Sequence, residues 1–170
     1  MNEFDFVRYM RSIAENLKAI GHNPTEKRFY RMSSLRGLEE VLTSLSSAMV
    51  PAIAVVDNPD GRFLEDPSQV RDREMFTFLV FGRLIMDDYD QQEEEKKNLK
   101  SIVLKIMAKM HEHRVSDLEL GTNHGLKRLD ISTFSYKTIS PLPDNLIAIY
   151  VNFALDSPES LTVDPDDWFE

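Results

Sequence analysis

The stretch "AIAVVDNPDGRFLEDPSQVRDREMFTFLVFGRLI", residues 52–85, decides the fold, because two strongly apolar runs enclose an acidic segment rich in turn formers. The first run, residues 50–57, is apolar on both faces, as in a strand that is covered on both sides. The second, residues 74–86, alternates with a period of two and predicts a long strand. The "NPDG" at residues 58–61 predicts a turn, so we expect a long loop around Asp57 to Arg73 that connects the strands and contacts a partner.

The long predicted strand has two apolar faces. In an isolated domain one face of a sheet is usually exposed to solvent. This strand, however, places the apolar Leu79 and Phe81 on the face opposite to Phe76, Phe78 and Val80. We therefore expect something to cover the side chains of Leu79 and Phe81.

Three segments repeat apolar residues at helical spacing. The first spans residues 4–20 and stops at Gly21, which readily adopts a left-handed conformation. The second follows a cap at Ser33 or Ser34, and the third has acidic first turns and a basic last turn. The three apolar stripes are Phe6, Met10, Ile13, Leu17 and Ile20, then Leu35, Leu38, Leu42 and Leu45, and finally Leu99, Ile102, Val103, Ile106, Met107 and Met110.

Three more segments are typical of strands. They are "KRFYRM" at residues 27–32 and two long runs at about 127–139 and 145–156, which "SPLPDN" joins. A change in the direction of the apolar side chains predicts a bulge near Ser132. The pattern predicts an α+β fold, with a mainly antiparallel sheet of four or five strands packed by about three helices. We expect a single domain over residues 1–156 and an acidic C-terminal tail or arm over 157–170.

The composition narrows the class of protein. The chain has 170 residues, of which 42% are hydrophobic, enough for one buried core. It has no cysteine, no run of eighteen apolar residues and no basic-then-apolar signal at its start, so we expect a cytoplasmic protein without membrane contact. Of the net charge of −9, −6 lies in residues 156–170, and the rest of the chain is nearly balanced.

This acidic balance argues against a nucleic-acid partner, because binding a phosphate backbone requires lysines and arginines that release counterions. The one basic cluster, Lys27, Arg28, Arg31 and Arg36, is interleaved with aromatic residues that could stack on bases. The cluster is either a nucleic-acid contact or, as we favour, a solvated strand edge.

The acidic turn segment fails the tests for a chemical site. An EF-hand loop with Gly61 at its sixth position would begin at Val56 and end at Pro67, where acids are required. The "DDYD" at residues 87–90 is either a weak Mg²⁺ contact or, as we favour, a helix cap. We expect no catalytic residue, no cofactor and no metal, and a protein that is not an enzyme.

The histidines show no metal-binding spacing. His111 and His113 diverge by about 200° on a helix, so we expect two solvated cations near a helix C-terminus. His22 and His124 lie in predicted turns with no identified partner.

The tail holds the only tryptophan of the chain, Trp168, beside Phe169. Its prolines and acids predict an extended or disordered segment. The aromatic pair is instead typical of an arm that is anchored in a pocket. An arm that reached a neighbouring subunit would be a means of assembly.

Five segments follow one another between residues 50 and 156: "PAIAVVD", "MFTFLVFGRLI", "LKSIVLKIMAKM", "LKRLDISTFSY" and "NLIAIYVNFAL". In this order they resemble the tail-terminator, or tail-completion, proteins of long-tailed bacteriophages and prophages. The extra helix "SLRGLEEVLTSLSS" departs from the simpler members of that family. The resemblance implies a structural assembly protein whose ring, typically a hexamer, caps the tail tube and contacts the head connector.

The resemblance also implies partners and contact residues. The partners are other copies of the chain, tail-tube proteins and connector proteins, met in the cytoplasm during assembly and retained in the virion. Apolar surface on a second sheet face would be used in a ring, where one patch meets a different patch on the next copy. The contact residues we expect are Leu79, Phe81, Asp57, Asp60, Arg62, Trp168 and Phe169.

Two other classes remain open. A small acidic adaptor or immunity-type protein would bind a basic partner one to one. A ligand-binding or enzymatic α+β domain would need a polar pocket with convergent ionisable groups, and we find no convincing set in the sequence.

Overall fold

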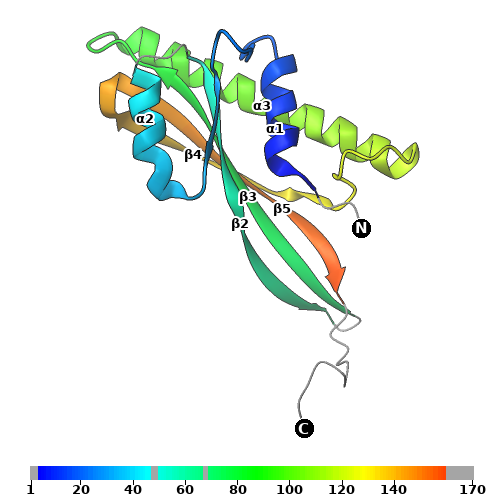
Figure 1. Ribbon diagram of the computed structural model, residues 1–170. Helices are drawn as coiled ribbons and strands as arrows, with labels where there is room; N and C mark the ends of the chain where they lie inside the picture. Colours follow the sequence, from blue (N-terminus) through cyan, green and yellow to red (C-terminus); the bar gives the residue numbers. More distant parts are fainter. Residues whose placement is uncertain (1–3, 47–49, 67–68, 160–170) are drawn as a thin grey trace.

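A computed structural model describes residues 4–46, 50–66 and 69–159 of the chain, and Figure 1 shows the arrangement. The elements are α1 (Phe6–Asn16), β1 (Phe29–Met32), η1 (Leu35–Gly37), α2 (Leu38–Ser46), β2 (Ala52–Asp66), β3 (Gln69–Arg83), α3 (Tyr89–Glu119), β4 (Leu129–Leu142), η2 (Pro143–Asn145) and β5 (Leu146–Glu159).

The strands form one sheet with the order β1-β2-β3-β5-β4. The short β1 runs parallel to β2, and the other neighbours are antiparallel. The predicted α+β fold with a mainly antiparallel sheet is therefore confirmed.

Helices α1 and α3 cover one face of the sheet. Most of both predicted stripes is buried there, with Met10 of α1 and Ile106 of α3 in the same cluster as Phe78 and Phe153, while Leu17 and Met107 are partly buried. Burying a large apolar side chain contributes about 1.5–3 kcal/mol, so this cluster supplies a major part of the stability of the fold.

The second face of the sheet is covered by α2, because α2 lies between the two parallel strands β1 and β2 in the chain and crosses back over the sheet. Val41, Leu42 and Leu45 of α2 pack in one cluster with Leu79 and Phe81, whose side chains are completely buried. The expectation that something covers these two residues is confirmed. Their predicted role as contacts to another subunit is wrong, since the chain's own helix covers them.

The prediction of a long loop around residues 57–73 is wrong, because most of this segment forms two paired strands. Strand β2 continues to Asp66 and pairs with β3, from Asp60 opposite Met75 to Asp66 opposite Gln69. The "NPDG" sequence lies at a register shift between Val56 and Asp60 rather than at a turn. Proline cannot donate to a strand ladder, so a bulge accommodates it and the pairing resumes beyond.

Other local predictions are confirmed. Asp88 caps α3 by accepting a hydrogen bond from the Gln91 backbone N–H at 3.0 Å. The register of β4 shifts between Asp130 and Ser135, around the predicted bulge. Gly21 has the expected positive φ of +63°, but it does not end the first helix: α1 stops at Asn16, so the predicted end of this helix at residue 20 is wrong. The last strand runs to Glu159, past its predicted end at residue 156.

Within the described ranges, no helix combines the length and the apolar character that crossing a membrane would require. Even the 31-residue α3 is rich in charged residues.

We predict that Leu45→Ala lowers the free energy of unfolding by about 2–4 kcal/mol, because Leu45 is fully buried against the second face of the sheet. Urea denaturation followed by circular dichroism measures the change. Leu104→Ala is the control, since Leu104 is 54% exposed on α3 and its truncation should cost less than about 1 kcal/mol. Equal effects of the two substitutions would contradict the assignment of α2 as the cover.

Candidate functional site

The sheet projects beyond its helices as a three-stranded arm, which we define as residues 60–66, 69–75 and 156–159 (Figure 1). None of the described side chains of the arm belongs to either buried cluster. The arm thus adds polar, half-exposed sheet to the molecule without adding to its core, and such a feature calls for a reason other than stability.

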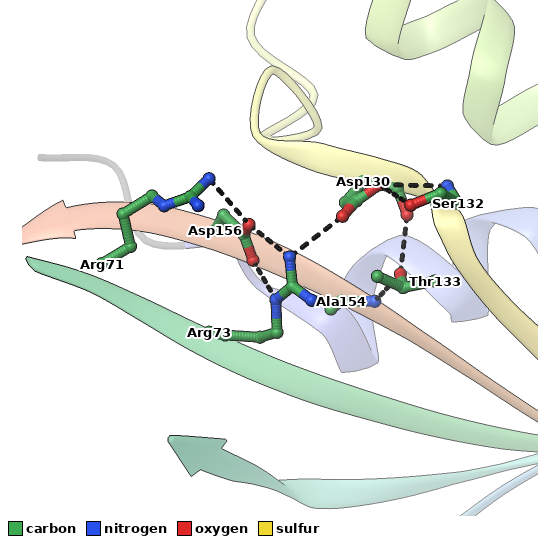
Figure 2. A network of polar contacts seen from close by, with 7 residues as sticks. All are labelled: Arg71, Arg73, Asp130, Ser132, Thr133, Ala154 and Asp156. Atoms are coloured by element: carbon green, nitrogen blue, oxygen red, sulfur yellow. Dashed lines mark hydrogen bonds and ion pairs between the residues drawn. The ribbon is translucent and has the colours of Figure 1, made fainter. Parts of the chain in front are cut away.

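An arginine holds the root of the arm (Figure 2). The Arg73 guanidinium donates through Nε to Asp156 Oδ1 and through Nη2 to Asp156 Oδ2, both at 2.6 Å, and Nη2 also donates to Asp130 Oδ2 at 3.0 Å. Arg71 approaches the same Asp156 carboxylate at 3.5 Å. Bidentate arginine–carboxylate pairs fix orientation as well as distance, so the network joins β3 rigidly to β5 and β4 at this point.

The bulge in β4 makes this network possible. Asp130 Oδ1 accepts hydrogen bonds from the Ser132 backbone N–H at 3.0 Å and from the Ser132 hydroxyl at 2.6 Å. The Thr133 hydroxyl accepts from the Ala154 backbone N–H at 2.8 Å, in place of a strand carbonyl. Side chains thus replace ladder hydrogen bonds where the register of β4 slips, and the Asp130 carboxylate turns toward Arg73.

The charges of the network stabilise one another. The side-chain hydrogen bond to Asp156 is the main reason why the pKa of Arg73 is raised. Hydrogen bonding from Ser132, and then the charge of Arg73, lowers the pKa of Asp130. Arg73 and Asp156 are 16% and 14% exposed, so the network is shielded from solvent more than a surface ion pair is.

The two faces of the arm differ in charge. Directly opposed residues on neighbouring strands point to the same face, so the register places the described cations of the arm on one side, the Arg face. The other side, the acidic face, has four carboxylates, and Phe63 stands among them with 68% of its surface exposed. Ser157 lies on the same face near the base of the arm, and its Oγ accepts a hydrogen bond of 2.7 Å from Arg128, which belongs to the loop before β4. The Arg face holds Asp60, Arg62, Leu64, Arg71, Arg73 and Asp156, and the acidic face holds Phe63, Glu65, Asp72, Glu74 and Glu159.

The structure separates the predicted contact residues. Asp60 and Arg62 lie exposed on the Arg face of the arm. Asp57 lies at the bulge instead, where its carboxylate accepts a hydrogen bond from Arg31 Nε and its side chain is only 11% exposed. Asp57 is thus an internal partner of Arg31, which corrects its predicted role in a loop. Trp168 and Phe169 lie outside the described residues.

A second polar cluster, at the end of α3, was missed by the sequence reasoning. Asp117 is 6% exposed, and its Oδ1 accepts hydrogen bonds from the Thr122 hydroxyl at 2.8 Å and from His124 Nδ1 at 2.7 Å. The backbone N–H groups of His124 and Leu126 also donate to this carboxylate, both at 2.9 Å. The carboxylate therefore holds the loop after α3 in place.

His113 joins this cluster to α1. Its ring stacks on the His124 ring with a centroid distance of 4.0 Å, and its Nδ1 hydrogen-bonds with the Tyr9 hydroxyl at 2.9 Å. Burial, and then the charge of His124, lowers the pKa of His113. The prediction of a solvated cation at a helix terminus is wrong for His113, because α3 continues to Glu119 and α1 packs over the ring.

The pKa values of the neighbouring groups follow from the same burial. Burial alone would raise the pKa of Asp117, but the hydrogen bonds from His124, Leu126 and Thr122 bring it below its ordinary value. Burial, and then the Asp117 and Glu112 charges, raises the pKa of Tyr9. The carboxylate is thus charged and the phenol neutral near pH 7, as a structural clamp between α1, α3 and the loop requires.

Neither cluster has the geometry of a metal centre. In the part of the chain that the structure describes, no three side chains of the His, Asp and Glu types converge as metal ligands would. His113 and His124 stack face to face, so their ring nitrogens cannot both point at one ion.

Comparison with known proteins gave no family for this chain: no protein-family model matches it, and a search of curated proteins returned no significant match.

We predict that Arg73→Gln lowers the free energy of unfolding by about 1–3 kcal/mol, because it removes charge-assisted hydrogen bonds from two half-buried carboxylates. Arg62→Gln is the matched control on the same face, and it should change stability by less than about 0.5 kcal/mol since Arg62 is exposed. Chemical denaturation of both variants gives the comparison. If the two variants lose the same stability, the network does not anchor the arm.

We predict that stability falls as the pH is lowered from about 7.5 to 5.5, in part through His113. The pKa of His113 is lower in the folded chain than in the unfolded chain, so the unfolded chain binds the proton first as the pH falls. His113→Gln keeps an acceptor for Tyr9 but cannot titrate, so its stability should change less over this range. His111→Gln, at an exposed position, is the control and should keep the wild-type pH dependence. A wild-type pH dependence in His113→Gln would contradict the assignment.

Proposed function

We propose that the chain is a structural assembly protein that forms a ring with copies of itself and resembles a phage tail terminator in this respect. The observation that carries the proposal is the projecting arm, whose two faces differ in charge and which packs on neither helical layer of its own chain. In the ring, the Arg face of one copy lies against the acidic face of the next.

Contact between two different faces favours a ring over a two-fold dimer. An interface that pairs one patch with a different patch is head-to-tail, and it closes into a ring when the rotation between copies divides a full turn. Complementary charges fix the register of such an interface and speed its formation. The internal bonds of Arg73 and Arg71 leave the exposed Arg62 as the cation best placed to meet a neighbour's carboxylate.

Two further features of the arm support the proposal. Phe63 lies on the acidic face with 68% of its surface exposed, and a large aromatic residue on a polar surface is typical of an interface anchor. Strand β1 pairs with β2 only from Ile53 to Val56, so within the described residues no strand pairs with the outer edge of β2 in the arm. Exposed strand edges are templates for pairing with another chain.

The resemblance supplies the partners in this proposal. A ring of this kind would cap the last ring of tail-tube subunits and present its other surface to the connector, and it would have no enzymatic activity. A basic partner that binds the acidic face one to one, as for an adaptor, is the competing function, and the four carboxylates around Phe63 support it.

We predict that the wild-type chain forms a ring-sized species as its concentration rises, and that Phe63→Ala and Arg62→Glu each weaken this association by roughly tenfold. Light scattering and native mass spectrometry over a wide concentration range measure it. Lys137→Glu makes the same charge change at an exposed position of β4 and should have little effect. Raising the salt concentration should weaken association, since solvent-exposed charges are screened.

A chain that stays monomeric at all concentrations, alone and with tail-tube subunits, would contradict the ring proposal. A monomer that captures one copy of a basic protein through the acidic face would favour the adaptor instead.

A further inference from the structure

An open groove of about 650 Å³ lies where α1, β1 and α2 meet, away from the arm. Four cationic side chains line it, Arg11, Lys27, Arg31 and Arg36, together with one carboxylate, Glu40. On a chain with a net charge of −9, such a concentration of positive charge in one concavity points to an anionic occupant.

Contacts within the chain position three of these cations. The Arg11 guanidinium lies over the Phe29 ring at 5.5 Å, and the Lys27 ammonium lies over the Tyr30 ring at 4.8 Å. Arg31 is bonded to Asp57 through Nε, and this contact leaves the two terminal nitrogens of the guanidinium for another acceptor. The groove is therefore a pre-positioned set of donors, although Arg11, Lys27, Arg31 and Arg36 themselves are exposed.

The chain itself carries a segment of matching chemistry. Residues 160–170, which lie outside the described residues, contain Asp164, Asp166, Asp167 and Glu170 and no lysine or arginine. Trp168 and Phe169 follow the aspartates directly, and aromatic rings bind favourably beside guanidinium and ammonium groups. We propose that the basic groove of one copy binds residues 160–170 of a second copy. This inference rests on the proposed self-association.

The length of the segment argues for a second copy. Glu159 pairs with Val70 at the far end of the arm, whereas the C-terminal end of β1 is level with Thr77. Glu159 and the end of β1 are thus separated by about 23 Å along the strand direction, which is seven residues, and by about 14 Å across the sheet, which is three strand spacings. The direct distance between them is about 27 Å. The eight residues from Glu159 to Asp167 span at most about 26–29 Å. Asp166 and Asp167 would reach the groove of their own chain only with the intervening segment in an extended conformation, and a neighbour's groove imposes no such limit.

The binding chemistry is that of carboxylates on guanidinium groups. Asp166 and Asp167 can accept from the free terminal nitrogens of Arg31 and from Arg36, with Lys27 as a further donor. Such contacts at an open groove are sensitive to salt, so high ionic strength should release the segment.

The first experiment uses the full chain and a fluorescein-labelled synthetic peptide of residues 160–170, with binding followed by fluorescence anisotropy. We expect saturable binding that the double substitution Lys27→Glu and Arg36→Glu weakens at least tenfold. The matched control, Lys105→Glu with Lys137→Glu, changes the net charge equally at exposed positions that do not line the groove, and it should bind as the wild type does. A peptide with asparagine in place of Asp164, Asp166 and Asp167 should lose most of its affinity.

Absence of peptide binding, or equal weakening by both double substitutions, would overturn the proposal. Binding of a short single-stranded oligonucleotide in the groove with displacement of the peptide at lower concentration would overturn it in favour of a nucleic-acid site. Because the peptide is added to dilute chain, this test does not depend on whether the chain forms rings.

The second experiment uses Trp168, the only tryptophan, as a reporter on the full chain. Acrylamide quenching of its fluorescence should fall as the concentration rises, in step with the mass from light scattering, and the groove variant should not show this protection. Mass that rises with unchanged quenching would overturn the docking and leave the ring intact. Constant mass with peptide binding intact would instead count against the ring. Protection that is the same at all concentrations would overturn the assignment to a second copy.

Discussion

The ladder between β3 and β5 runs without a register shift from Val70 to Arg83, and the rest of the structure depends on it. It is shared by the buried body, where Phe78 and Phe153 pack, and by the arm, where the paired side chains are polar. Because the ladder is continuous, the strands of the arm extend directly from the strands of the buried core. On either side, β2 shifts register between Val56 and Asp60, and β4 shifts between Asp130 and Ser135, both near the point where the arm begins.

The same ladder sets the charge of the arm. Side chains alternate between the two faces, so Arg71 and Arg73 share one face with Asp156, and Asp72 and Glu74 share the other with Glu159. A slip of one residue in the register would mix the two sets. The network of Arg73 with Asp156 and Asp130 therefore stabilises the fold and, by holding the register at the root, maintains two chemically different surfaces.

The sequence predicted the body of the fold better than its projecting features. Helical stripes, such as those that contain Met10 in α1 and Ile106 in α3, and alternating runs, such as residues 74–86, are local signals, and the elements they predicted are present. Residues 60–66 were not predicted as a strand, because "NPDG" is a sequence typical of turns. Their strand conformation depends on pairing with β3, which in turn pairs with β5, and this tertiary pairing outweighs the local preference. The cover of Leu79 by α2 and the stacking of His113 on His124 were missed for the same reason, since no spacing along the chain encodes them.

We propose that copies of the chain associate through the arm. Hydrogen–deuterium exchange of the wild-type chain at low and high concentration, read at the backbone amides of β2 between Asp60 and Asp66, tests it most directly, because the outer edge of this strand is unpaired within the described residues. We expect slower exchange in this segment at high concentration, with the amides of the residues in the two buried clusters unchanged. Slower exchange elsewhere while the arm amides exchange at the same rate, in a sample whose mass has risen, would contradict it.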